Sequence, residues 1–242
     1  MKEFEKAPAK EAAQMFVTKH FPQCQAALLS GSVVRGEETE TSDLDIIIFD
    51  DILADSYRES LMAFGWPIEI FAHNFQSYKQ ICKTDYERAR PSMLRMVSEG
   101  IILKGHKIID DIKKEADEIL AEGPAKWSEE TIRIKRYFIT DALDDLIGSN
   151  NRAESIFIAN TLADLVHEFV LRTNGHWIGA SKWMMRSLRE FDQPFAEEYF
   201  HAFDTFYKHG EIELVVKLVE AVLEPHGGRL FEGFSIGKGE PN

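Results

Sequence analysis

The chain has 242 residues, of which 44% are hydrophobic and 29% charged, so it is long enough for one large domain or two small ones. Its 41 acidic and 28 basic residues give a formal net charge of −13, which argues against nucleic-acid binding through a broad basic surface. The two cysteines, Cys24 and Cys82, provide neither a disulfide framework nor metal-ligand spacing. The N-terminus lacks the apolar core of a signal peptide and no apolar run approaches membrane-spanning length, so we expect a cytoplasmic protein with no membrane partner.

The first half of the chain alternates segments with helical and strand-like patterns of apolar residues. Apolar residues at helical spacing predict amphipathic helices, and short apolar runs bounded by turn residues predict strands. The segment 56–64 is predicted to be a helix because Gly65 and Pro67 follow it. The expected helices are 9–21, 56–64, 75–89, 92–98 and 108–121, the expected strands are 24–29, 43–49, 68–72 and 101–103, and a turn at 31–36 opens one helical turn.

The second half contains helical patterns only. Ser128 precedes two glutamates, which is typical of a capped helix start with acidic residues in its first turn. Helices are expected at 131–146, 153–173, 181–191, 194–208 and 211–223. The predicted fold is therefore an α/β (α+β) domain with a small mixed sheet over residues 1–123, followed by an all-α helical bundle over residues 124–242.

Two aspartates stand one residue apart in Ser42-Asp43-Leu44-Asp45, directly before an apolar run. Residues two apart on a strand share a face, so both carboxylates are predicted to point the same way, about 6–7 Å apart along the backbone. Adjacent carboxylates repel each other unless a cation lies between them, and a divalent cation on a phosphate-bearing substrate is the usual solution. The alternative is a solvated loop that enters a strand.

A glycine-serine turn, Gly31-Ser32, precedes the aspartates. Gly31 lets a phosphate approach the backbone, amides at the start of a helical turn point at the anion, and the Ser32 hydroxyl adds a donor. Arg35 is predicted either to bind phosphate bidentately or to pair with a nearby acid such as Asp43. Ser42 is expected to hydrogen-bond local backbone and to fix the approach to the aspartates. An ordinary strand-to-helix turn is the alternative.

A third carboxylate is expected because two divalent cations exceed the charge of two aspartates. Glu69 lies between apolar residues in the predicted strand 68–72. If this strand lies next to 43–49, Glu69 joins Asp43 and Asp45. The alternative is a glutamate on an edge strand that faces water.

These motifs together resemble the DNA polymerase β-like nucleotidyltransferase superfamily. They are Gly31-Ser32, Arg35-Gly36, Ser42-Asp43-Leu44-Asp45 and the apolar strand that carries Glu69. The chain is most similar to minimal members and to antibiotic-modifying members such as the kanamycin and lincosamide nucleotidyltransferases. The motifs cover residues 28–71, whereas the helical half resembles the family in layout only.

The resemblance implies an enzyme that uses Mg²⁺ to move a nucleoside monophosphate from a nucleoside triphosphate to a hydroxyl of a small molecule, with release of pyrophosphate. An aminoglycoside-like antibiotic is one candidate acceptor. Glu69 would complete the metal site and accept the hydroxyl proton. The implied catalytic and metal-ligating residues are Asp43, Asp45 and Glu69, and the implied nucleotide-binding residues are Gly31, Ser32, Arg35 and Ser42.

Other interpretations stay open at this point. The acceptor could be a protein or RNA partner, as in toxin–antitoxin pairs, or the chain could be a degenerate nucleotide-binding module without activity. Asp141, Asp144 and Asp145 share a predicted helix face and offer either a catalytic base or a solvated surface. A homodimer is expected because related antibiotic-modifying enzymes can build their sites across a dimer.

Overall fold

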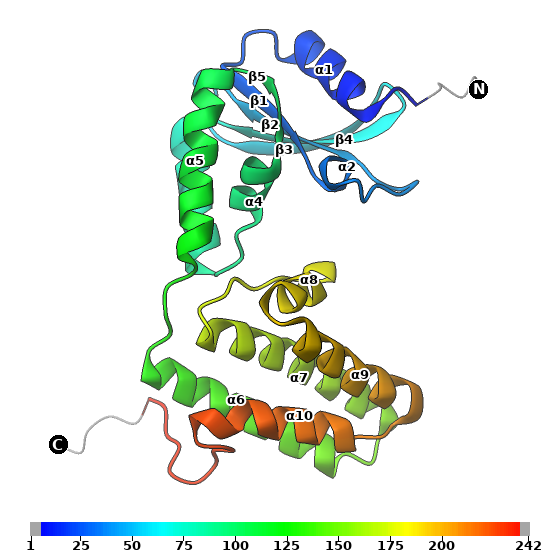
Figure 1. Cartoon of the computed structure of the whole chain (residues 1–242), viewed down its shortest axis with the longest axis vertical. Helices are drawn as coiled ribbons and strands as arrows, with labels where there is room; N and C mark the ends of the chain where they lie inside the picture. The colour runs from blue at the N-terminus through cyan, green and yellow to red at the C-terminus, as the bar shows by residue number, and fades with distance from the viewer. Residues whose placement is uncertain (1–5, 238–242) are drawn as a thin grey trace, which may run out of the picture. The chain divides into compact units, whose positions relative to one another are not determined.

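The computed structural model describes residues 6–237 and divides after Gly123 into two compact units (Figure 1). The first unit contains a sheet with helices on both faces, and the second contains helices without strands among its described residues. Over the described residues, the fold is therefore α+β with a mixed sheet, as predicted. No helix between residues 6 and 237 is both long enough and apolar enough to cross a membrane.

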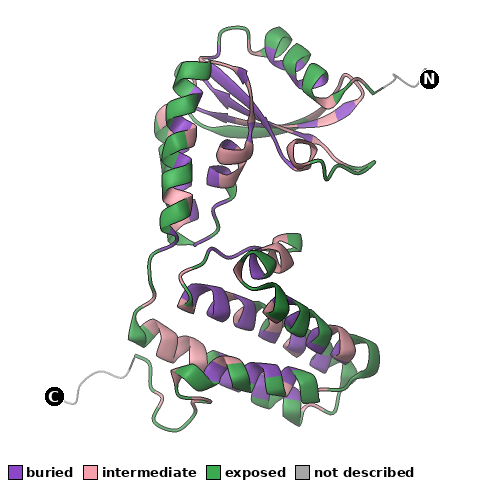
Figure 2. Ribbon diagram, in the orientation of Figure 1, coloured by how far each residue is buried: buried purple, intermediate pink, exposed green. Residues whose placement is uncertain are grey.

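One mixed sheet organises the first unit. Its strands are β1 (Ala26–Ser30), β2 (Leu44–Phe49), β3 (Tyr57–Ala63), β4 (Trp66–His73) and β5 (Ile101–Lys104). They lie in the order β3-β4-β2-β1-β5, in which β2 and β4 are parallel and the other neighbours are antiparallel. The central strands β1 and β2 are almost entirely buried because both of their faces are covered, which explains their continuous apolar runs (Figure 2).

Helices cover the two faces of this sheet through separate cores. The helices of the unit are α1 (Ala9–His20), α2 (Ser32–Arg35), α3 (Phe75–Glu87), α4 (Ser92–Glu99) and α5 (His106–Glu122). On one face α1 packs Phe16 and Val17 against a core that includes Ile46 and Ile48. On the other face α3, α4 and α5 pack against Ile47 and Phe49. The strand alternation therefore decides which helices each side chain of β2 meets.

The segment predicted as a helix over 56–64 is strand β3, so that prediction was wrong. Phe64 and Gly65 both have positive φ, 53° and 80°, and form the two-residue turn of a hairpin that pairs Ala63 with Trp66. Such turns require positive φ at both central residues. β3 is an edge strand and largely exposed, so its residues show no apolar alternation, and several of them favour helices in isolation. Pairing with β4 overrides that local preference.

The second unit is a bundle whose helix bounds agree with the predicted ones to within two residues. It comprises α6 (Glu129–Gly148), α7 (Arg152–Thr173), α8 (Lys182–Phe191), α9 (Gln193–His209), α10 (Glu213–Leu223) and the 3₁₀ helix η1 (Glu224–His226). α6 packs on α7, and α9 packs on both α8 and α10. Fully buried side chains such as Leu143, Phe169 and Phe206 fill the core between them.

The first helix of the bundle begins at the predicted cap. The Thr131 amide donates to Ser128 Oγ at 3.1 Å. We expect Ser128→Ala to lower the free energy of unfolding of this unit by about 1 kcal/mol, because one amide loses its acceptor. Urea unfolding followed by tryptophan fluorescence measures this, since three of the four tryptophans belong to the unit. Ser128→Asn, which retains a capping side chain, should unfold like the wild type, and equal stability of Ser128→Ala would contradict the cap's contribution.

Candidate active site

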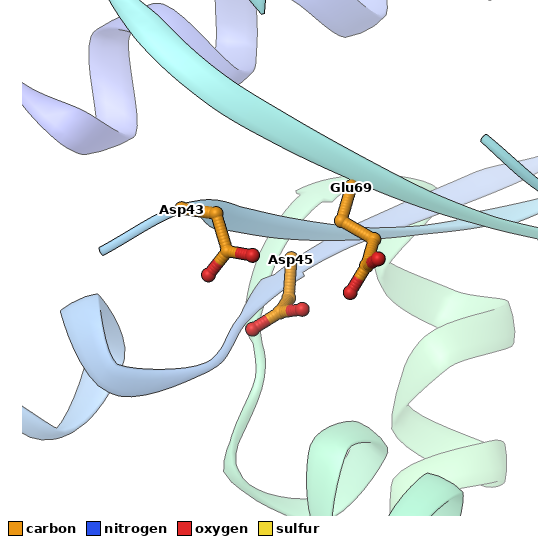
Figure 3. Close-up of side chains that lie close together, drawn as sticks. All are labelled: Asp43, Asp45 and Glu69. Carbon is orange, nitrogen blue, oxygen red and sulfur yellow. The ribbon is translucent and has the colours of Figure 1, made fainter. Parts of the chain in front are cut away.

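Two aspartates stand where β2 begins. Asp43 directly precedes the first residue of the strand and Asp45 is its second residue. Because alternate side chains share a face, their carboxyl groups point to the same side of the sheet (Figure 3). Ile47 and Phe49 continue this face into the core formed with α3, α4 and α5. The aspartates therefore lie at the end of a buried face, where the strand meets solvent.

Glu69 reaches the aspartates from the parallel neighbour of β2. The register pairs it with Asp45, and Figure 3 shows its carboxyl group on the same side of the sheet. One carboxylate oxygen from each of Asp43, Asp45 and Glu69 lies within 4.8 Å of the other two. β4 lies between β2 and β3, and the Glu69 side chain is 17% exposed, so the interpretation as an edge-strand residue facing water was wrong. We refer to these three residues as the acidic cluster.

The acidic cluster disfavours the ionised form of its central member. Burial, together with the negative charges of Asp43 and Glu69, raises the pKa of Asp45 from an ordinary value of 3.8 to about 6. Positive charges on Arg58 and Arg35 act in the opposite direction without cancelling the effect. A cation near Asp45 would relieve this repulsion, so the electrostatics favour a cation at this place.

Two side chains of β3 hold Glu69. Arg58 Nε donates to Glu69 Oε1 at 2.7 Å, and Arg58 Nη2 lies 2.5 Å from Oε2. Ser60 is the register partner of Glu69 and its Oγ donates to Oε1 at 3.2 Å. Sequence analysis missed both residues because it placed them on a helix. The glycine of the Phe64-Gly65 pair, directly before the strand-forming segment that begins at Trp66, was the one local indication of a turn at this place.

Gly31 brings the backbone against the acidic cluster. It has φ 85° and ψ −163°, a conformation that only glycine adopts readily, and it precedes the single turn α2. A Cβ atom at this position would overlap the Asp45 carboxylate. The turn therefore touches the acidic cluster, and a polar ligand held by these carboxylates would lie next to the turn's backbone.

Ser32 and Ser42 connect the turn to the approach of β2. Ser32 Oγ donates to Ser42 Oγ at 3.1 Å, and Ser42 Oγ accepts from the Thr39 amide at 2.8 Å. Ser42 thus makes the local backbone contact expected of it. It also positions Ser32, which sequence analysis did not anticipate.

Arg35 is engaged in ion pairs. Its Nε donates to Glu37 at 3.1 Å and its Nη1 to Glu99 at 2.8 Å, so it connects α2 to the end of α4. Although burial lowers the pKa of Arg35, hydrogen bonds to Glu99 and Glu37 raise it overall. Of its two predicted roles, the structure displays ion pairing, and binding of a phosphate would compete with Glu99.

The chemistry of the donors fits a hard divalent cation. All three candidate ligands are carboxylate oxygens, which Mg²⁺ prefers. Ser30, the register partner of Asp45 on β1, is fully buried, and its Oγ has no hydrogen-bond partner within residues 6–237. Buried hydroxyls are rarely left unpaired, so an unpaired Oγ on the register partner of Asp45 fits a site that takes a further polar group. Both observations fit a site built for a hydrated cation.

The carboxylates proposed as a base in the second unit occupy its surface. Asp141, Asp144 and Asp145 are all exposed on α6. Arg229 Nη1 donates to Asp144 Oδ1 at 3.0 Å and its Nη2 to Glu220 at 2.7 Å. Asp144 therefore has a structural role within its own unit, because it forms an ion pair with Arg229 of the C-terminal segment.

Comparisons with known proteins find no match in sequence and a distant similarity in structure. No protein-family model matches the chain, and no curated protein is similar to it in sequence. A nucleotidyltransferase-like protein from Exiguobacterium sibiricum has a similar structure, with 12% sequence identity, a TM-score of 0.48, and coverage of 89% of this chain and 74% of that protein. A similarity this distant says nothing about individual residues.

Proposed function

We propose that the protein is a Mg²⁺-dependent nucleotidyltransferase, which moves a nucleoside monophosphate from a nucleoside triphosphate to a hydroxyl of a small molecule and releases pyrophosphate. The observation that carries this proposal is the convergence of three carboxylates beside a glycine turn. Carboxylates from adjacent strands supply the hard oxygen ligands that two-metal phosphoryl-transfer sites need. The glycine turn supplies a backbone that a polyphosphate can approach closely.

Each residue of the site has a proposed role. Asp43, Asp45 and Glu69 hold the divalent cations, which when bound would acidify the acceptor hydroxyl and stabilise the charge on the phosphates. Gly31 and Ser32 bind the terminal phosphates through the first amides of α2, which have no partner inside the helix. Phosphates bound by Gly31 and Ser32 would lie next to Asp45, because the backbone at Gly31 lies so close to the Asp45 carboxylate that a Cβ atom there would overlap it.

One carboxylate oxygen of Glu69 is more available to a cation than the other. A carboxylate oxygen has two lone pairs, and Oε1 already accepts from Arg58 and Ser60. Oε2 has only the Arg58 contact. Glu69 would therefore hold a cation through Oε2.

The proposed acceptor class follows from charge. A formal net charge of −13 would attract a cationic small molecule, such as an amine-rich aminoglycoside-like antibiotic. Ser42 and Arg35 are proposed to support nucleotide binding indirectly, by fixing Ser32 and the end of α2.

A transfer assay tests the proposal. With α-labelled ATP or GTP, Mg²⁺ and a panel of hydroxyl acceptors, the wild type should label an acceptor and release pyrophosphate. Asp43→Asn should lower the rate by on the order of a hundredfold or more, because a metal-binding carboxylate is lost. Asp55→Asn changes an exposed aspartate outside the acidic cluster and should leave transfer unchanged.

The same assay separates the other interpretations. Label on a co-purified protein or RNA, found by mass spectrometry, would move the acceptor from a small molecule to a macromolecule. Metal-dependent nucleotide binding without transfer to any acceptor would indicate a degenerate binding module. Full activity of Asp43→Asn would refute the assignment of the metal centre.

A further inference from the structure

Arg58 is held against the acidic cluster by several contacts despite its exposure. Its side chain is 64% exposed, yet its guanidinium binds both oxygens of Glu69. The guanidinium carbon also lies 4.9 Å from the ring centroid of Phe71, the register partner of Arg58 on β4. An exposed arginine held by a bidentate ion pair and a ring contact is fixed in place far better than one that makes a simple surface pair.

The charge of the acidic cluster changes markedly when Arg58 is counted with it. The three carboxylates carry up to three negative charges, and the guanidinium contributes one positive charge in direct contact with Glu69. The remaining charge of about two matches one divalent cation. A second cation would need the negative charge that a polyphosphate brings.

Arg58 and a cation can share Glu69. Oε1 is fully used by Arg58 Nε and Ser60 Oγ, whereas Oε2 keeps one lone pair directed away from the guanidinium. A cation on that lone pair and the guanidinium would then lie on one carboxylate, close enough to repel each other. Removing the guanidinium would remove this repulsion, while the hydrogen bond from Ser60 to Glu69 Oε1 would still hold Glu69.

We propose that Arg58 is a resident counter-ion of the acidic cluster, which weakens the binding of a divalent cation until the phosphates of a nucleotide bring further negative charge. This inference rests on the proposed function, because it requires the acidic cluster to be a metal site. Its consequence is that loss of the Arg58 charge strengthens metal binding in the absence of nucleotide. A unit charge about 5 Å from a divalent cation in a water-like surrounding, partly screened by salt, changes affinity roughly three- to tenfold.

A titration of the full chain with Mn²⁺ alone tests this inference. Free Mn²⁺ is measured by electron paramagnetic resonance at pH 8 and low salt, without nucleotide. We expect Arg58→Gln to bind Mn²⁺ roughly three- to tenfold more tightly than the wild type. Arg58→Lys, which keeps the charge, should remain within about twofold of the wild type. Lys114→Gln removes a positive charge from the exposed face of α5 in the same unit and should change nothing.

The salt dependence separates a charge effect from a structural one. The advantage of Arg58→Gln should shrink as the salt concentration rises to about 0.5 M, since screening removes the repulsion that the substitution relieves. Equal or weaker Mn²⁺ binding by Arg58→Gln would overturn the inference, and weaker binding would show that Arg58 orients Glu69. Arg58→Met gives the same test if circular dichroism shows that Arg58→Gln is misfolded.

The titration also distinguishes failure of this inference from failure of the proposed function. A wild type that binds Mn²⁺, with binding lost in Asp45→Asn, supports the metal centre whatever Arg58 does. A wild type that binds no Mn²⁺, together with an Arg58→Gln variant that binds none, would remove the metal centre and the role of Arg58 together.

Discussion

Asp45→Asn should yield a protein that is inactive and, in the absence of metal ions, more stable than the wild type. Activity is expected to fall by on the order of a thousandfold, because the central carboxylate of the acidic cluster is lost. Stability should rise because the ionised Asp45 carboxylate is buried beside Asp43 and Glu69. Asparagine keeps the shape of the side chain and removes the charge.

The stability gain should depend on pH in a definite direction. The folded-state pKa of Asp45 is about 6, above the ordinary 3.8, so the folded chain takes up a proton before the unfolded chain does. The ionised carboxylate therefore costs stability above pH 6, and this cost disappears as the pH falls towards 4. We expect Asp45→Asn to gain about 1–3 kcal/mol at pH 8 and almost nothing at pH 4.

Urea unfolding in the presence of a chelator, at pH 8 and pH 4, measures this difference. Asp55→Asn, which removes an exposed carboxylate from the same unit, should show no comparable gain at pH 8. If Asp45→Asn is no more stable than the wild type at pH 8, the carboxylates do not repel each other as their positions indicate.

The second large effect is expected at Gly31. Gly31→Ala should abolish metal binding and transfer, and should lower the free energy of unfolding by about 1–3 kcal/mol. Two causes add together: alanine does not readily adopt φ 85° with ψ −163°, and its Cβ would overlap the carboxylate of Asp45. The turn or the carboxylate has to move.

Gly36→Ala is the matched control for this substitution. Gly36 ends α2 with φ 68° in the left-handed region, and a Cβ there would meet nothing within 4 Å. Alanine at position 36 should therefore cost about 1 kcal/mol of stability and leave Mn²⁺ binding intact. If both variants lost Mn²⁺ binding, the conformation of α2 would be what metal binding requires, and the absence of a Cβ atom beside Asp45 would not be the cause.

The sequence was sufficient to predict those elements whose apolar pattern reflects their own burial. β2 is an apolar run because helices cover both sheet faces, β4 has apolar residues at its alternate, buried positions, and the long helix α7 carries many buried apolar residues. β3 was mispredicted because an exposed edge strand acquires its structure from hydrogen bonds to β4 and shows no pattern of its own. Local sequence does not encode that pairing.

In the acidic cluster too, features set by local sequence were predictable and features set by strand pairing were not. The shared direction of Asp43 and Asp45 follows from strand alternation alone, so it was predictable. The proximity of Glu69 depended on β2 and β4 being neighbours, which the sequence suggested without specifying. Arg58 could not be placed at all, since its contact with Glu69 exists only through the hairpin that was mistaken for a helix.

The pairing of β2 with β4 couples the acidic cluster to the folding of the whole sheet. Its carboxylates come from two parallel strands that are separated in the chain by β3, so they meet only where β2 and β4 are paired. A partly folded chain offers no such set of ligands, so a bound ion would favour the native state by thermodynamic linkage. At a hundredfold excess of ion over Kd this amounts to about 2.7 kcal/mol. The lifetime of the protein against proteolysis would then follow the concentration of free magnesium around it.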